Sequence, residues 1–208
     1  MSTLPKPFKK LHPEIQETLL RLEQTIPTAF QEKCIPAIKS GANLFCTGKK
    51  ESGKTTTLIL TTLQKLKHEA VGTAPRAFVL VEDMEKAQSV YAAFVHYARY
   101  STLRIYLADE KVHIDLQKSE IFEGIDILIA TSKSLNTLFL SNGVTTSQLK
   151  IFSIDDAEYL AQKVAYSQIL SITQSVPKCQ YVLYSEKLIP GIKRLESYFM
   201  EYSRVISS

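Results

Sequence analysis

One segment in the first quarter of the chain has the residue types that bind polyphosphate. It reads Gly48-Lys49-Lys50-Glu51-Ser52-Gly53-Lys54-Thr55 and matches the pattern G-x-x-x-x-G-K-[ST] at every fixed position. In such a loop, backbone N–H groups and the positive end of the following helix surround phosphate oxygens. We therefore expect Lys54 to reach the outer phosphates of a nucleotide and the Thr55 hydroxyl to hold Mg²⁺. The residues of this segment expected to contact the nucleotide are Gly48, Ser52, Gly53, Lys54, Thr55 and Thr56.

A pair of carboxylates follows an apolar run much later in the chain. Asp155-Asp156-Ala157-Glu158 comes directly after Ile151–Ile154. A carboxylate that leaves a buried strand beside a phosphate loop is where such nucleotide-binding proteins hold magnesium, so Asp155 is the candidate Mg²⁺ ligand. Asp156 could orient or deprotonate an attacking water, and with Lys54 the two acids form the candidate catalytic set. As an alternative, either acid would suit the N-cap of a helix over Ala157–Thr173.

The segments around these motifs predict the scaffold that positions them. Short runs rich in β-forming residues alternate with helical stretches, which is typical of a parallel α/β sheet. Several runs are apolar throughout, as expected for strands covered on both faces. The predicted strands are Asn43–Thr47, Ala77–Val81, Leu103–Leu107, Ile125–Ala130, Ile151–Ile154 and Gln180–Tyr184. We expect an α/β, three-layer P-loop NTPase fold with a mostly parallel central sheet and helices on both faces.

Helices are expected on both sides of the first predicted strand. The stretch Thr55–Lys67 has helical character and follows the phosphate loop directly. Two further helices are expected to precede the first strand, one starting at Pro13 and one at Pro27, because proline is tolerated in the first helical turn.

Composition narrows the class of protein. The chain has 208 residues, of which 45% are hydrophobic and 22% charged, enough apolar material for one globular domain over residues 1–208, with a helical region at 1–40 and a core at 41–208. The longest apolar runs fall short of the roughly 20 residues that cross a bilayer. The N-terminus lacks a secretory pattern, so we expect a cytoplasmic protein without a membrane partner. The three cysteines and four histidines have no metal-binding spacing, and a net charge of +4 is a mild basic bias.

With these motifs in place, nearly the whole chain resembles the N-terminal RecA-like lobe of DEAD-box RNA helicases. The matching segments, in the family's order, are Pro27-Thr28-Ala29-Phe30-Gln31 for the end of the Q motif, Gly48–Thr55 for motif I, Asp155–Glu158 for motif II and Ser185-Glu186-Lys187 for the Ser-Ala-Thr motif. The resemblance implies ATP and Mg²⁺ as ligands. It also implies that Gln31 recognises adenine and that Ser185 stands in the third motif.

Departures from the family pattern fall on the residues that act on the phosphates. Glu51 stands where the family has a second internal glycine, and Asp156 replaces a glutamate that is one methylene longer. Because a misplacement near 1 Å costs about a hundredfold in rate, we expect slow hydrolysis or none. Glu186 and Lys187 replace the alanine and threonine of the third motif, which puts communication between hydrolysis and RNA in doubt.

The segments that contact RNA in the family differ more. Glu82–Ala87 stands in place of Pro-Thr-Arg-Glu-Leu-Ala, with Met84 at the position of the phosphate-binding arginine. Of Thr-Pro-Gly-Arg only Thr131 remains, with Lys133 close by. We expect Thr131 and Lys133 to be the remaining RNA contacts and the affinity for RNA to be low, because acidic residues repel a phosphate backbone.

A helicase of this kind needs two RecA-like lobes, and the second supplies arginines to the transition state. This lobe alone is therefore not expected to separate strands. Either a second lobe or a protein partner acts in trans, or the chain is a fragment, or it has a role that does not turn over ATP. The leading hypothesis is an ATP-binding domain associated with RNA, with weak or lost ATP hydrolysis. The alternative is a pseudo-helicase scaffold for protein interactions with a vestigial nucleotide site. A small-molecule kinase is the weakest hypothesis, because no arginine-rich lid is evident in the sequence.

Overall fold

Strands whose residues are all buried form the centre of the sheet, which is covered on both sides. The computed structural model describes residues 4–208. Its strands are β1 (Leu44–Thr47), β2 (Ala77–Val81), β3 (Ile105–Leu107), β4 (Ile127–Thr131), β5 (Ile151–Ile154), β6 (Gln180–Ser185) and β7 (Arg204–Ser207). They form one seven-stranded sheet in the order β3-β4-β2-β5-β6-β1-β7. Every strand pair is parallel.

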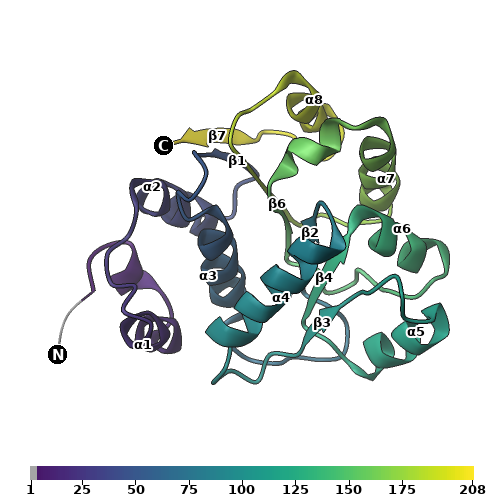
Figure 1. Ribbon diagram of the computed structural model, residues 1–208, viewed down its shortest axis with the longest axis horizontal. Coiled ribbons are helices and arrows are strands. Elements are labelled where there is room, and N and C mark those ends of the chain that lie inside the picture. Colours follow the sequence, from purple (N-terminus) through teal and green to yellow (C-terminus); the bar gives the residue numbers. More distant parts are fainter. Residues whose placement is uncertain (1–3) are drawn as a thin grey trace.

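Helices cover both faces of this sheet (Figure 1). The helices are α1 (Pro13–Arg21), α2 (Ala29–Lys39), α3 (Lys54–Leu66), α4 (Met84–Tyr97), α5 (Ile114–Glu123), α6 (Ser132–Leu140), α7 (Lys163–Gln174) and α8 (Pro190–Lys193). Short 3-10 helices are formed by Phe8–Lys10, Ala157–Ala161 and Arg194–Ser197. The buried side chains divide into two clusters, one under α1 to α4 and the other under α5 to α8. The three-layer α/β fold expected from the sequence is confirmed.

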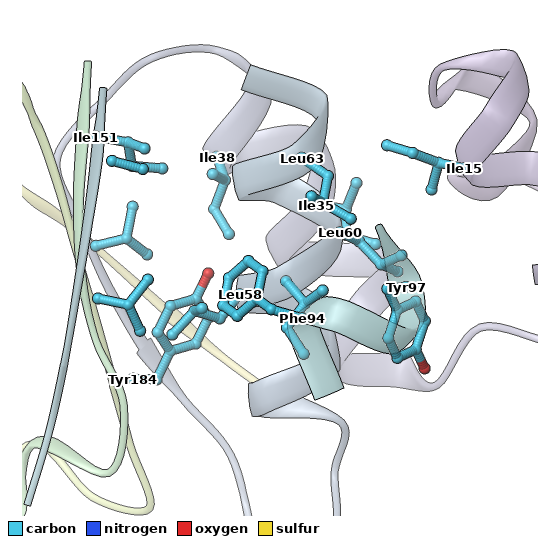
Figure 2. Close-up of a cluster of buried hydrophobic side chains, with 14 of the residues drawn as sticks. Ile15, Ile35, Ile38, Leu58, Leu60, Leu63, Phe94, Tyr97, Ile151 and Tyr184 are labelled. Atoms are coloured by element: carbon cyan, nitrogen blue, oxygen red, sulfur yellow. The ribbon is translucent and has the colours of Figure 1, made fainter. Parts of the chain in front are cut away.

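Alternation along the strands assigns side chains to the two clusters. In β2, Ala77, Val79 and Val81 belong to the first cluster, whereas Phe78 and Leu80 belong to the second. Figure 2 shows the first cluster, where α3 and α4 pack against the sheet. Because consecutive side chains of a strand point to opposite faces, a strand covered on both sides is apolar throughout.

A buried ion cluster lies at the opposite end of the sheet from the phosphate loop. The carboxylate of Asp126, just before β4, accepts from Arg76 Nη2 at 2.6 Å and from Arg104 Nε at 2.9 Å. Arg76 and Asp126 are both buried. Burial alone would raise the pKa of Asp126, but the hydrogen bonds from Arg104 and Arg76 hold that pKa below its ordinary value. Asp126 therefore stays ionised and ties together the segments that precede β2, β3 and β4.

Several element boundaries differ from the sequence expectations. The second helix begins at Ala29 rather than Pro27, because Thr28 forms a capping box with Gln31. The helix expected over Ala157–Thr173 is divided into a 3-10 turn and α7, and Asp156 makes no side-chain cap. The alternative prediction, in which one of these acids is the N-cap of a single helix over Ala157–Thr173, is therefore wrong. The strand β7 was not expected.

Two further points concern the ends of the chain and the membrane. Residues 1–3, part of the N-terminal stretch judged not to be secretory, lie outside the described residues. Within residues 4–208, no helix combines the length and the apolar character needed to cross a bilayer.

Candidate functional site

Parallel strands bring the phosphate loop and the acidic pair to the same edge of the sheet. The loop follows β1 and the acids follow β5, and only β6 lies between these strands. Thr55 Oγ1 donates to Asp155 Oδ2 at 2.7 Å, although the residues are 100 positions apart in sequence. A cleft of about 740 Å³ opens here, with Lys54, Thr55, Thr56 and Asp156 in its lining.

The phosphate loop curls around the side chain of its own lysine. Lys54 is only 6% exposed, and its Nζ donates to the carbonyl oxygens of Gly48 and Lys49, both at 3.1 Å. Gly48 in turn donates its N–H to the Ser185 carbonyl at the end of β6. A Cβ at position 48 would lie 2.6 Å from the Phe30 ring, so this close approach requires glycine.

The backbone of the loop has a left-handed conformation at Glu51, the position where the family pattern has a glycine. Glu51 has φ of +63°, in the left-handed region that glycine adopts without penalty. For other residues this region is disfavoured by about 1–2 kcal/mol. Glu51 is exposed and lines the cleft, so its carboxylate adds negative charge where a polyphosphate would approach.

The donor set around Asp155 fits a magnesium ion. Asp155 is fully buried, and among the described residues its Oδ1 has no hydrogen-bond partner. Burial raises the pKa of Asp155 above its ordinary value, although the positive charge of Lys86 and the hydrogen bond from Thr55 act in the opposite direction. A hydroxyl and a buried carboxylate with a free oxygen are hard ligands of the kind that Mg²⁺ takes alongside phosphate oxygens.

Lys86, in the first turn of α4, also contacts the acidic pair. Its Nζ lies 2.7 Å from Asp156 Oδ2 and 3.3 Å from Asp155 Oδ2. Burial alone would lower the pKa of Lys86, but the hydrogen bond to Asp156 and the charge of Asp155 raise it above its ordinary value. Lys54 Nζ lies 3.9 Å from the other oxygen of Asp156. Asp156 is therefore held between two ammonium groups.

Sequence reasoning missed Lys86 because it treated Glu82–Ala87 only as an altered RNA-binding segment. The sheet order places β2 directly beside β5, so the segment that follows β2 lies next to the acids that follow β5. Strand order is the signal that was needed.

Glu158 connects the acidic segment to the end of β6. Its Oε1 accepts from the backbone N–H of Glu186 at 2.5 Å and of Lys187 at 3.4 Å. Because these donors are backbone groups, the contact does not depend on the side chains that differ from the family pattern. Ser185 is buried, and within the described part of the chain its hydroxyl has no hydrogen-bond partner.

Gln31 lies against the wall of the phosphate loop. Its Oε1 accepts from the Thr28 N–H at 2.9 Å, and Thr28 Oγ1 donates to the Ser52 carbonyl at 2.7 Å. A Cβ at Gly53 would lie 2.9 Å from Gln31 Nε2. Thr28 thus ties the start of α2 to the loop, with the Gln31 amide between them.

The two candidate RNA contacts lie together but are engaged by an acidic side chain. Thr131 caps α6, and its Oγ1 donates to Glu110 Oε1 at 3.1 Å. Lys133 Nζ lies 2.5 Å from Glu110 Oε2. A carboxylate therefore already occupies the donors that a phosphate would need. Glu110 lies in the loop after β3, and no motif in the sequence marked it.

Comparison with known proteins gives a consistent result. The family model described as DEAD/DEAH box helicase matches residues 28–186. A probable ATP-dependent RNA helicase, ddx42 of Dictyostelium discoideum, is 26% identical over 186 residues, which cover 88% of this chain and 18% of that protein. Eukaryotic initiation factor 4A of Caenorhabditis elegans is 26% identical over 196 residues, 90% of this chain and 47% of that protein. This chain thus spans less than half the length of either relative.

Solved structures share the fold. A DEAD box protein from the hyperthermophile Methanococcus jannaschii superimposes with a TM-score of 0.86 at 18% identity, covering 95% of this chain and 54% of that one. A variant of S. cerevisiae dbp5 bound to gle1 and ip6 gives a TM-score of 0.83 at 17% identity, covering 100% of this chain and 53% of that one. The RecA-like architecture expected from the sequence is confirmed.

Proposed function

This chain belongs to the DEAD/DEAH box helicase family, and on that premise we propose that it is a RecA-like domain that binds ATP with magnesium. The observation that carries this proposal is the 2.7 Å contact between the Thr55 hydroxyl and Asp155. It joins the end of the phosphate loop to the acid after β5, across the intervening strand β6. A nucleotide in the cleft beside this contact would meet residues from both motifs.

Each residue of the proposed site has a distinct role. Lys54 turns from the loop carbonyls to the outer phosphates, and the backbone N–H groups of the loop hold the remaining oxygens. Thr55 and Asp155 hold Mg²⁺, which when bound offsets the charge of the phosphates. The Nε2 group of Gln31 is the proposed donor to adenine, because Oε1 is already taken by Thr28.

ATP hydrolysis by this site is proposed to be slow. A catalytic carboxylate must accept a hydrogen bond from the attacking water. Asp156 is held by Lys86 at 2.7 Å and has a shorter side chain than the glutamate of the family pattern. Both features make the Asp156 carboxylate less able to accept a hydrogen bond from the attacking water. Strand separation is proposed to require a second RecA-like lobe as well, which would complete the transition state.

RNA is the proposed but weakly held macromolecular partner. Thr131 and Lys133 present a hydroxyl and an ammonium group near the carboxyl end of β4. The carboxylate of Glu110 already accepts a hydrogen bond from Thr131 and forms an ion pair with Lys133. An RNA phosphate must therefore displace this carboxylate, or bind beside it against the repulsion between two negative charges.

A second function is favoured by one observation. Without any ligand, Lys86 forms ion pairs with Asp155 and Asp156, and Lys54 Nζ lies 3.9 Å from Asp156. A site in which two ammonium groups offset two carboxylates without nucleotide would suit a pseudo-helicase scaffold for protein interactions.

Calorimetry separates the two functions. Wild-type chain titrated with Mg·ATP is expected to give a saturable heat that Lys54→Ala abolishes. The matched control is Lys178→Ala, which removes an exposed lysine outside the cleft lining and is expected to bind as the wild type does. In thermal melts, ligand binding to the native state alone raises the melting temperature. No heat and no shift in the wild type would favour the scaffold.

A further inference from the structure

The side chain of Lys86 lines the cleft, and its ammonium group contacts both acids. Its side chain is 31% exposed, and the side chain of Asp155, one of its two partners, is fully buried. It reaches the acids from α4, an element that carries no part of the phosphate loop. The separation from both carboxylates, 2.7 Å and 3.3 Å, is that of direct ion pairs.

The position of Lys86 in its helix indicates that the acids hold it there. A cation in the first turn of a helix faces the positive end of the helix dipole, which disfavours it. The backbone of this turn is anchored separately, because Asp83 Oδ1 accepts from the Lys86 N–H at 2.8 Å. The anchored backbone leaves the long side chain free to extend, and the two carboxylates provide the attraction that overcomes the dipole.

Lys86 and Thr55 share one oxygen atom. Asp155 Oδ2 accepts the hydrogen bond of the Thr55 hydroxyl and also faces Lys86 Nζ. These are the two groups, hydroxyl and carboxylate, that the proposed function assigns to magnesium. A polyphosphate that enters this cleft needs positive charge between its oxygens and the two acids, and Lys86 already supplies one such charge.

We propose that Lys86 is a built-in cation of the nucleotide site, which lets this chain bind a nucleoside triphosphate without a divalent metal and which competes with that metal for Asp155 and Asp156. The inference rests on the proposed ATP binding and goes beyond it by naming the metal-free nucleotide as a ligand. Asp155 Oδ1 has no partner among the described residues, but the Oδ2 atoms of both acids face the ammonium group, so a divalent ion that takes these atoms must displace it. The metal therefore improves binding only slightly.

The test compares ATP affinity in excess EDTA and in excess Mg²⁺ by calorimetry. For the wild type the two dissociation constants are expected to agree within about threefold. In Lys86→Met, which keeps an unbranched side chain as far as Cε but removes the charged Nζ, the affinity in EDTA is expected to fall by about tenfold and to be recovered in Mg²⁺. Lys187→Met removes a different lysine of the cleft, one that is exposed, and serves as the control. Its affinity is expected to change equally in both buffers.

The outcomes separate this inference from the function on which it rests. A wild type that binds ATP in Mg²⁺ but loses that binding in EDTA overturns the role of Lys86 and leaves the proposed function standing. A wild type that binds in neither buffer overturns both. The wild-type comparison needs no variant, so a loss of binding in EDTA overturns the inference even if Lys86→Met fails to fold; if that variant does not fold, the Mn²⁺ titration of the wild type against Lys86→Gln tests the competition instead.

A second measurement uses no nucleotide. Mn²⁺ titrated into the protein and followed by electron paramagnetic resonance reports metal binding to the acids directly. Lys86→Met is expected to bind Mn²⁺ at least about tenfold more tightly than the wild type, because the competing ammonium group is gone. Equal Mn²⁺ affinities in the two proteins would overturn the competition.

Discussion

Replacing Glu110 by glutamine is expected to increase the affinity of this chain for single-stranded RNA. Glu110 holds both Thr131 and Lys133, so its charge opposes an incoming phosphate at the same donors. Glutamine has nearly the same shape and can still accept hydrogen bonds, so the substitution removes the charge with little change in packing.

The size of the effect follows from the exposure of the carboxylate. Two unit charges 4 Å apart interact by about 1 kcal/mol in water and about 4 kcal/mol near a protein surface. The Glu110 side chain is 33% exposed, so water screens it substantially. We expect a gain of about 1–2 kcal/mol, or roughly 5- to 30-fold in affinity. Releasing Lys133 adds one phosphate contact, which steepens the salt dependence by about 0.7 in the logarithmic slope for a single strand.

Fluorescence anisotropy with a labelled oligouridylate at two salt concentrations measures both quantities. The matched control is Glu123→Gln, which removes the same charge from an exposed position at the end of α5. If both variants gain equally, the improvement comes from net charge and not from the site at Thr131. An unchanged affinity in Glu110→Gln would refute the idea that this carboxylate occupies a phosphate position.

Three other substitutions test separate parts of the structure. Asp126→Asn is expected to lower the free energy of unfolding by about 3–5 kcal/mol, because it leaves the buried Arg76 without its counter-charge. The folded-state pKa of Asp126 is lowered, so its contribution is complete above about pH 4 and is lost as the pH falls through that pKa; urea melts from pH 7 to pH 3 should show this loss in the wild type and not in the variant. Glu51→Gly is expected to stabilise the chain by about 1 kcal/mol and to tighten ATP binding, since it removes a left-handed non-glycine residue and a negative charge; thermal melts and calorimetry measure the two effects, and looser ATP binding would contradict the reasoning. Asp156→Glu is expected to raise ATP turnover by about tenfold or more in a phosphate-release assay; an unchanged rate would mean that the length of this acid is not what limits hydrolysis.

The parts of the fold and of the site that could be predicted from the sequence are those specified by local sequence patterns. The strand ranges Ala77–Val81 and Ile151–Ile154 were predicted as they stand, because both strands are mostly apolar and have clear boundaries. The phosphate loop was recognisable because its function needs fixed residue types within eight positions. The proximity of Thr55 and Asp155 followed from a general rule, that the carboxyl ends of parallel strands lie at one edge of the sheet.

Features that depend on strand order were not predictable. Lys86 meets the acids because β2 lies beside β5, and Glu110 meets Thr131 because β3 lies beside β4. No periodicity in one segment specifies which other strand will be its neighbour. The strand β7 was missed for a different reason: its residues are mostly exposed, so they lack the apolar run by which the other strands were found.

The pairing of β7 with β1 restrains the strand that leads into the phosphate loop. Arg204 donates its N–H to the Asn43 carbonyl at the start of β1, and Ser208 does the same to Thr47 at its end. The Thr47 and Ser207 hydroxyls are 2.8 Å apart, directly before Gly48. If β7 detached, β1 would become an edge strand with a row of open backbone groups. The backbone of β1 would then be held by β6 alone, so we expect loosening of β7 to weaken the proposed binding of phosphate by the loop that follows β1.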